Sequence, residues 1–214
     1  MSEKPKKEKV KEQIEVGKIG EDFFLKYYVP TIKQFVEKQI VDMRGTQFEK
    51  DYDIDFLILP KDMFVDKNNL EWQKSIKNEL IYHTEKNIGE SNIFAIEIKT
   101  DTKAIKTGNI AYDITSHDKP GGLARSLADF AFFVIIDENN TIAKYCMVNM
   151  FKFRRVIGQQ IKDVNKIGGF FMTYFKDEEN EKDGNSLLLL TSFNFLEKNN
   201  VAKVYNFKVF NGTL

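Results

Sequence analysis

A strand-like stretch near the middle of the chain carries a glutamate and a lysine on the same face. In "SNIFAIEIKTD", apolar residues occupy every second position, and Glu97 and Lys99 fall on the positions between them. A period of two is typical of a β-strand with one covered face. Taken alone, the stretch fits an ordinary strand whose other face meets solvent.

A second predicted strand, in "DYDIDFLILP", brings further carboxylates. Asp53 and Asp55 fall on one face of this strand, which ends at Pro60. If the two strands pair, as strands that follow one another often do, two or three carboxylates and one lysine come together. Asp55 is the better metal ligand, because an aspartate between large apolar residues is costly to bury without a partner. Asp53 is either a second ligand or the solvated start of the strand.

Carboxylates gathered in one place repel each other, and a hard cation removes that cost. Mg²⁺ binds through one or two carboxylates, waters and phosphate oxygens. Such an ion polarises a phosphate and generates a nucleophilic hydroxide. Lys99 would then orient or help deprotonate the attacking water, or stabilise the charge that develops on phosphorus. We therefore expect a Mg²⁺ site, in which Mn²⁺ can substitute.

An aspartate on one strand followed by Glu-x-Lys on the next is the hallmark of the PD-(D/E)xK nucleases, a superfamily that includes restriction endonucleases and archaeal Holliday-junction resolvases. The chain resembles this superfamily through Asp55 and the run Glu97-Ile98-Lys99. Many members also carry a glutamate on the first helix, and "GKIGEDFF" supplies Glu21 there. The segments "KTGNIAYDI" and "GGLARSLADF" resemble segments of phage and mobile-element members.

The resemblance covers residues 17–136, about half of the chain. It implies a restriction-endonuclease-like fold and a metal-dependent DNA endonuclease of the restriction, junction-resolving or mobile-element kind. It also implies that the backbone carbonyl of Ile98 joins Asp55 and Glu97 as a metal ligand, and that Glu21 faces the metals. Alternatively, Glu21 pairs with a lysine on its own helix surface. A homodimer is expected because cutting both strands of a duplex usually takes two active sites.

Basic residues that follow the predicted site are candidates for phosphate contact. Each is equally well explained as a solvated surface charge, as is a second basic cluster at 152–155. Asp113, on the polar side of the next predicted strand, either continues the site or faces solvent, and Tyr112 is assigned to the core. The candidates for DNA contact are Lys103, Lys106, Lys119 and Arg125.

The composition limits the class of protein. The 32 basic and 32 acidic residues cancel, so DNA binding must depend on a local patch. The single cysteine, Cys146, excludes an internal disulfide framework and fits a reducing compartment, so we expect a cytoplasmic location. No apolar run approaches the roughly 18–20 residues that span a bilayer, so no membrane association is expected.

The order of elements predicts an α/β fold with a central mixed sheet flanked by helices. A flexible basic tail is expected over 1–13 and a single domain over 14–214, with an insertion at about 61–90. Its first element is a helix over about 14–40, interrupted at Pro30. Two late segments, 186–196 and 202–210, are expected to form a closing pair of strands.

Two other hypotheses stay open. The first is a non-catalytic DNA-binding or scaffold protein that retains the nuclease fold. Degenerate members of the superfamily usually lose the lysine or a carboxylate, and both are present here. The second is a structural α/β protein whose acidic strands face solvent. The balanced net charge is compatible with both.

Overall fold

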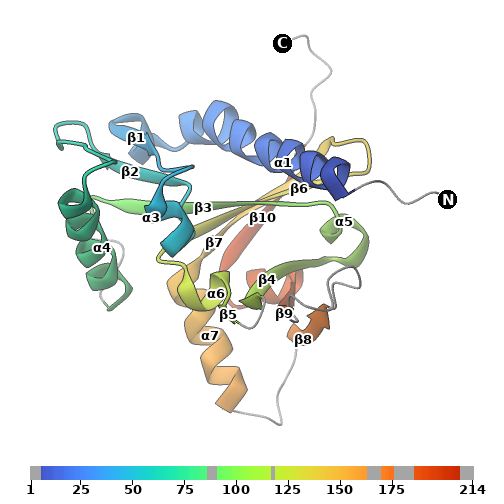
Figure 1. Cartoon of the computed structure of the whole chain (residues 1–214). Coiled ribbons are helices and arrows are strands. Elements are labelled where there is room, and N and C mark those ends of the chain that lie inside the picture. Colours follow the sequence, from blue (N-terminus) through green and yellow to red (C-terminus); the bar gives the residue numbers. More distant parts are fainter. Residues whose placement is uncertain (1–5, 86–90, 117–118, 163–169, 176–185, 208–214) are drawn as a thin grey trace.

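The computed structural model describes residues 6–85, 91–116, 119–162, 170–175 and 186–207, and it contains two β-sheets (Figure 1). The larger sheet consists, in spatial order, of β1 (Lys38–Asp42), β2 (Phe56–Pro60), β3 (Phe94–Asp101), β6 (Phe130–Ile136), β7 (Ile142–Asn149) and β10 (Ala202–Asn206). The smaller sheet consists of β5 (Lys119–Pro120), β4 (Asn109–Ser116), β9 (Ser186–Ser192) and β8 (Phe170–Phe175). The α-helices are α1 (Lys6–Phe23), α2 (Lys33–Val36), α3 (Gln47–Tyr52), α4 (Leu70–Glu85), α5 (Ala104–Thr107), α6 (Gly122–Arg125), α7 (Met150–Lys162) and α8 (Phe193–Lys198).

The larger sheet is mixed. Strands β3 and β6 are parallel, whereas β1–β2, β2–β3, β6–β7 and β7–β10 are antiparallel pairs. The protein is therefore an α/β protein with a central mixed sheet flanked by helices, as predicted. Of the helices that the structure describes, none has the length and apolar character needed to cross a membrane.

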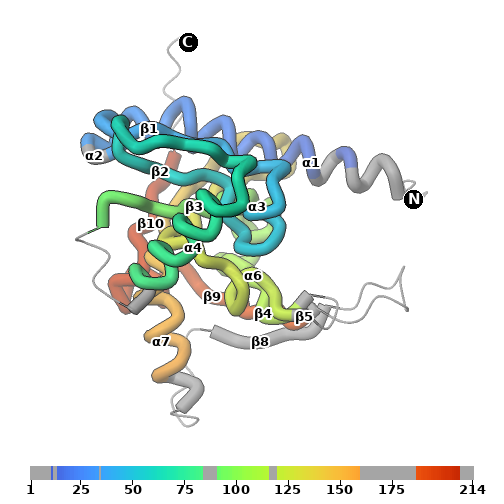
Figure 2. Tube along the Cα trace, turned by 60° about the vertical axis from the view of Figure 1, so that its left-hand side comes forward, coloured from blue at the N-terminus to red at the C-terminus, as the bar shows by residue number. Residues whose placement is uncertain are grey.

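The larger sheet is covered on both faces. Figures 1 and 2 show α1 along one face, and α6, α7 and the smaller sheet on the opposite side. Phe23 of α1 and Phe24, the residue that follows α1, pack against Phe56 and Ile96 of the sheet. The alternate positions of the same strands point the other way, so Leu57 contributes to a core shared with α4. Glu97, which follows Ile96, therefore points away from α1.

Strands β2 and β3 are direct neighbours although the segment 61–90 separates them in the chain. Phe56 pairs with Ile96 and Leu57 with Ala95. Helix α4 lies within this insertion and buries Ile76 and other apolar residues on the sheet; residues 86–90 lie outside the described part. The predicted pairing of the two strands is confirmed.

Several elements differ from the predictions. The first helix gives way to a π-helical turn at Phe24–Tyr28 and a 3₁₀ turn at Val29–Thr31 that contains Pro30. Residues 38–42 then form β1 rather than the end of a helix, because they pair with β2 along the sheet edge. Residues 6–13 belong to α1, where a flexible tail was expected, and residues 1–5 lie outside the described part. Strands β9 and β10 belong to different sheets, so the expected closing pair of strands is wrong.

Candidate active site

Glu97 and Lys99 lie together on one face of β3, and this face is covered rather than solvated. The Glu97 side chain is about 5% exposed, and its Oε1 lies 2.6 Å from Lys99 Nζ. Its Oε2 accepts a hydrogen bond from the Tyr112 hydroxyl of β4. The hypothesis that this acidic strand faces solvent is therefore wrong for Glu97.

Electrostatic interactions with three carboxylates keep the Lys99 ammonium charged. Burial alone would lower the pKa of Lys99, but Glu97, Asp113 and Asp53 outweigh this effect and raise it. The ammonium also lies over the Tyr112 ring, 5.2 Å from its centroid, where a cation is attracted to the aromatic face.

Asp55 directly precedes β2, and its side chain contacts the middle residue of the Glu97-Ile98-Lys99 run. Its Oδ2 accepts a hydrogen bond from the backbone N–H of Ile98 at 2.6 Å, and its own N–H donates to Ile96 O at 2.9 Å. Burial raises the pKa of Asp55 to about 7; the Ile98 bond opposes this rise, while Glu97 and other carboxylates add to it. Asp55 is therefore a partly buried acidic group that lies beside the Glu97-Ile98-Lys99 run.

Asp53 reaches the site by a different route from the one predicted. Residues 47–52 form α3, whose Thr46 cap accepts from Glu49 N at 3.2 Å, and the strand begins only at Phe56. Asp53 ends α3 in a left-handed conformation with φ of 50°. Its carboxylate pairs with Arg125 of α6. The prediction that Asp53 shares a strand face with Asp55 is wrong, because α3 takes up the residues before them.

Glu21 belongs to α1, on the opposite side of the sheet from the side to which Glu97 points, and it is paired. Gly20 allows α1 to approach β3, since a Cβ there would overlap Thr100 Oγ1. Glu21 pairs with Arg44, not with a lysine of its own helix. The Arg44 guanidinium also donates to Asp42 Oδ2 at 2.6 Å and lies 4.9 Å from the centroid of the Phe56 ring. The Glu21 charge adds to the rise in the Asp55 pKa.

A polar cavity of about 210 Å³ opens beside Lys99. Gly122 lines this cavity, and a Cβ at this position would lie 3.5 Å from Asp53 Oδ2 and 3.6 Å from Glu97 Oε1. The missing side chain of Gly122 thus keeps open a space that both carboxylates border. The lining residues are Asp53, Lys99, Asp113, Pro120, Gly121, Gly122 and Arg125.

The basic residues proposed for phosphate contact are differently placed. Arg125 lines the cavity, but its guanidinium is bound to Asp53 and donates to Lys50 O at 2.9 Å. Lys103 and Lys106 lie past the end of β3, where Lys106 forms an exposed ion pair with Glu138 at 3.2 Å. Lys119 belongs to β5, next to the cavity, and its side chain lies outside the described part.

Two charged residues near the site, Asp129 and Arg154, were not predicted as site residues from the sequence. Asp129, 2% exposed, accepts from Ala95 N at 2.8 Å and so holds the start of β3. Burial raises the pKa of Asp129 to about 7. Arg154 of α7, predicted only as part of a basic cluster, donates to Leu123 O at 3.2 Å and Ser126 O at 2.6 Å. The "AD" of "GGLARSLADF" was the available signal for Asp129.

The carboxylates that would bind Mg²⁺ already have basic partners within the protein. In the described ranges, no three Asp, Glu, His or Cys side chains are gathered closely enough to hold an ion. Glu97 is paired with Lys99, and Asp53 with Arg125. The groups that border the space at Gly122 are nevertheless carboxylate oxygens, which are the kind of ligand that a hard cation takes.

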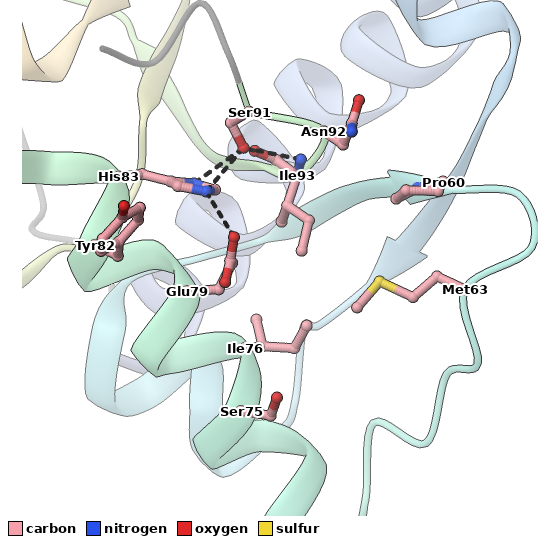
Figure 3. A pocket seen from close by; sticks show the side chains of 10 residues that line it. All are labelled: Pro60, Met63, Ser75, Ile76, Glu79, Tyr82, His83, Ser91, Asn92 and Ile93. Atoms are coloured by element: carbon pink, nitrogen blue, oxygen red, sulfur yellow. Dashed lines mark hydrogen bonds and ion pairs between the residues drawn. The ribbon is translucent and has the colours of Figure 1, made fainter. Parts of the chain in front are cut away.

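A second hollow, of about 470 Å³, lies between α4 and the ends of β2 and β3 (Figure 3). Within it Ser91 Oγ lies 3.1 Å from His83 Nδ1 and 2.9 Å from His83 Nε2, and Glu79 Oε1 lies 3.2 Å from Nε2. The Ser91 hydroxyl donates to Ile93 O at 2.7 Å and accepts from Ile93 N at 3.0 Å, as in a local turn. Because the hydroxyl proton is directed to a backbone carbonyl, we interpret this cluster as one that fixes the His83 ring and the turn before β3.

The chain matches no protein-family model, no curated protein and no solved structure. The chemistry of the site must therefore be inferred from its own residues. Asp55 and Glu97 are two carboxylates, and Lys99 is a cation that lines a polar cavity. Such a set is suited to binding a metal ion and an anionic substrate.

Proposed function

We propose that this protein is a Mg²⁺-dependent DNA endonuclease with a restriction-endonuclease-like fold. The observation that carries the proposal is the 2.6 Å hydrogen bond from Ile98 N to Asp55 Oδ2. It ties an aspartate that directly precedes β2 to the residue between Glu97 and Lys99 on β3. The mixed sheet with helices on both faces supports the same fold.

Each residue has a role in the proposed site. Asp55, Glu97 and the Ile98 carbonyl would hold Mg²⁺, with Asp53 and Glu21 as additional carboxylates. When bound, the ion supplies a Lewis acid that polarises a phosphate and lowers the pKa of a bound water.

Lys99 acts through its charge. Because its pKa is raised, it is protonated at neutral pH. In that form it stabilises negative charge that develops on the phosphate and does not remove a proton from water. Of the roles considered for this lysine, its environment favours charge stabilisation.

DNA is the proposed substrate. Lys103, Lys106, Lys119 and Arg125 are the candidates for backbone contact, with Arg125 first having to leave Asp53. Two copies of the chain would be needed to cut both strands of a duplex. The restriction, junction-resolving and mobile-element kinds of nuclease are all compatible with this site.

A non-catalytic DNA-binding or scaffold protein is the second candidate function. It is favoured by the internal pairing of the acidic groups, since Glu97, Asp53 and Glu21 each have a basic partner. In that case the pairs serve stability, and metal ions have no effect on DNA.

Cleavage of supercoiled plasmid DNA tests the proposal. The wild type should nick or linearise the plasmid with Mg²⁺ or Mn²⁺ and not with EDTA. Lys99→Ala should lose about 100-fold or more in rate, the usual scale for removal of a charge-stabilising group. Lys74→Ala, which removes an exposed lysine on α4, is the matched control and should cut at the wild-type rate.

Binding of Mg²⁺ without cleavage is measured separately by thermal melting. Mg²⁺ should raise the melting temperature of the wild type, and Glu97→Gln should lose most of that rise. A wild type that binds DNA but cuts none of the plasmid, linear and branched substrates with either ion would favour the non-catalytic alternative. Equal cleavage by the wild type and Lys99→Ala would refute the assignment of the site.

A further inference from the structure

One buried side chain of the smaller sheet contacts both members of the Glu97–Lys99 pair. Tyr112 of β4 is 1% exposed. Its hydroxyl donates to Glu97 Oε2, and its ring lies beneath Lys99 Nζ, 5.2 Å from the ring centroid. A core tyrosine could pack without touching either group, so this double contact calls for an explanation beyond packing.

The Tyr112 ring packs against two other aromatic rings. Its centroid lies 5.9 Å from that of Phe133 on β6 and 6.1 Å from that of Phe153 on α7. An ionised carboxylate only accepts hydrogen bonds, and a phenol has one O–H donor, so the Tyr112 hydroxyl is the donor in this contact.

The two Glu97 oxygens have different surroundings. Oε2 is occupied by Tyr112, while Oε1 lies beside Lys99 and borders the space at Gly122. A free glutamate side chain samples several rotamers. A fixed donor on one oxygen leaves the other aimed at the place where an ion or substrate would bind.

We propose that Tyr112 is a positioning residue, whose hydroxyl orients the Glu97 carboxylate and whose ring supports the Lys99 ammonium. This inference rests on the proposed nuclease function for its kinetic consequence, but the contacts themselves are measurable without it. It makes β4, and through it the smaller sheet, part of the active site. A supporting group of this kind typically contributes about 10–100-fold to metal affinity or activity.

The test uses two substitutions and a matched control in the full chain. Tyr112→Phe removes the hydroxyl and keeps the ring, whereas Tyr112→Leu removes both. Tyr28→Phe is the control, because Tyr28 is a part-buried tyrosine whose hydroxyl donates to Met147 Sδ at 3.8 Å, on the α1 face.

Kinetics and metal binding form the first readout. Tyr112→Phe should lower kcat for DNA cleavage and the calorimetric affinity for Mn²⁺ by about 10-fold or more, with KM for DNA unchanged. Tyr28→Phe should match the wild type in both. If Tyr112→Phe retains wild-type kcat and Mn²⁺ affinity, or raises only KM, the positioning role is overturned.

NMR of the metal-free protein forms the second readout and does not need activity. The wild type should show a slowly exchanging Tyr112 hydroxyl proton, and a ring-current shift of the Lys99 ε-methylene. Tyr112→Phe should lose only the first signal and Tyr112→Leu both. Absence of both signals from the wild type would overturn the inference. If both signals are present but the wild type neither binds Mn²⁺ nor cuts DNA, the nuclease proposal fails while the positioning contacts stand.

Discussion

Replacing Asp129 by asparagine should change the free energy of unfolding in favour of the variant as pH rises from acidic to alkaline values. Asp129 is 2% exposed, and its Oδ2 accepts from Ala95 N at 2.8 Å. Its Oδ1 has no hydrogen-bond partner in the described part of the chain. An ionised carboxylate in this position lacks one of its ordinary partners, and burial raises its pKa from 3.8 to about 7.

The direction in which pH changes the free energy of unfolding follows from the number of protons bound in the native and unfolded states. Between the unfolded pKa near 4 and the folded pKa near 7, the native state holds one proton more than the unfolded state. The contribution of Asp129 to the free energy of unfolding therefore falls as pH rises through this window and is constant above it. At about 1.4 kcal/mol per pKa unit, the full cost of ionisation is about 4 kcal/mol, of which about 3 kcal/mol develops between pH 5 and 8.5.

Asparagine keeps the shape of the side chain and an acceptor for Ala95 N, but it carries no charge. Its amide N–H groups also need partners, at a cost of about 1–3 kcal/mol when they have none. That cost is the same at every pH. The difference between Asp129→Asn and the wild type should therefore shift by about 3 kcal/mol in favour of the variant from pH 5 to pH 8.5.

Urea unfolding at several pH values, followed by circular dichroism, measures this shift. Asp62→Asn, at an exposed position, is the control and should leave the pH dependence unchanged. If the unfolding free energies of Asp129→Asn and the wild type run parallel from pH 5 to 8.5, the account of Asp129 as a costly buried charge is wrong. A shift in the opposite direction would mean that Arg154 stabilises the carboxylate more than burial penalises it.

Three further substitutions test the geometry. Gly122→Ala should lower the calorimetric affinity for Mn²⁺ by about 10-fold without loss of fold, because a Cβ would lie 3.3 Å from Tyr112 Cε1 and within 3.6 Å of the carboxylates of Asp53 and Glu97. Gly17→Ala is the control and should bind Mn²⁺ as the wild type does, because no atom lies within 4 Å of a Cβ at that position. Gly20→Ala should reduce the free energy of unfolding in urea by about 1–3 kcal/mol through overpacking, and adding Thr100→Ala should recover part of the loss; full stability of Gly20→Ala alone would contradict the close approach of α1 to β3. Arg154→Lys should make the turn at 121–126 more sensitive to limited proteolysis, because lysine cannot reproduce the paired guanidinium donors; an unchanged digestion pattern would contradict its anchoring role.

The alternation of apolar and polar residues predicted correctly how several charged residues are placed on the strands. It placed Glu97 and Lys99 on one face of a strand and Asp55 near its neighbour, because side-chain direction in a strand depends only on position along the chain. It also predicted a mixed sheet flanked by helices. The pairing of β2 with β3 across a long insertion followed from the general tendency of successive strands to be neighbours.

The same alternation gave a wrong prediction for residues 51–55, which precede β2, because part of this stretch forms the end of helix α3. The aspartate-rich start of "DYDIDFLILP" fits a strand by period, but Thr46 caps α3 and the strand begins later. Asp53 still reaches the cavity, through a left-handed turn that places it against Arg125. Local sequence does not report which of two compatible conformations the surrounding packing selects.

The sequence by itself determined the acidic and basic groups of β3 and their common face. Only the tertiary structure decided what surrounds them: the Tyr112 hydroxyl from another sheet, the buried Asp129 behind β3, and the basic partners of Asp53 and Glu21. The physical reason is that the two kinds of information come from different distances along the chain. Periodicity reflects the local geometry of one strand, whereas burial, pKa and charge pairing depend on groups that other strands and helices bring within a few ångströms.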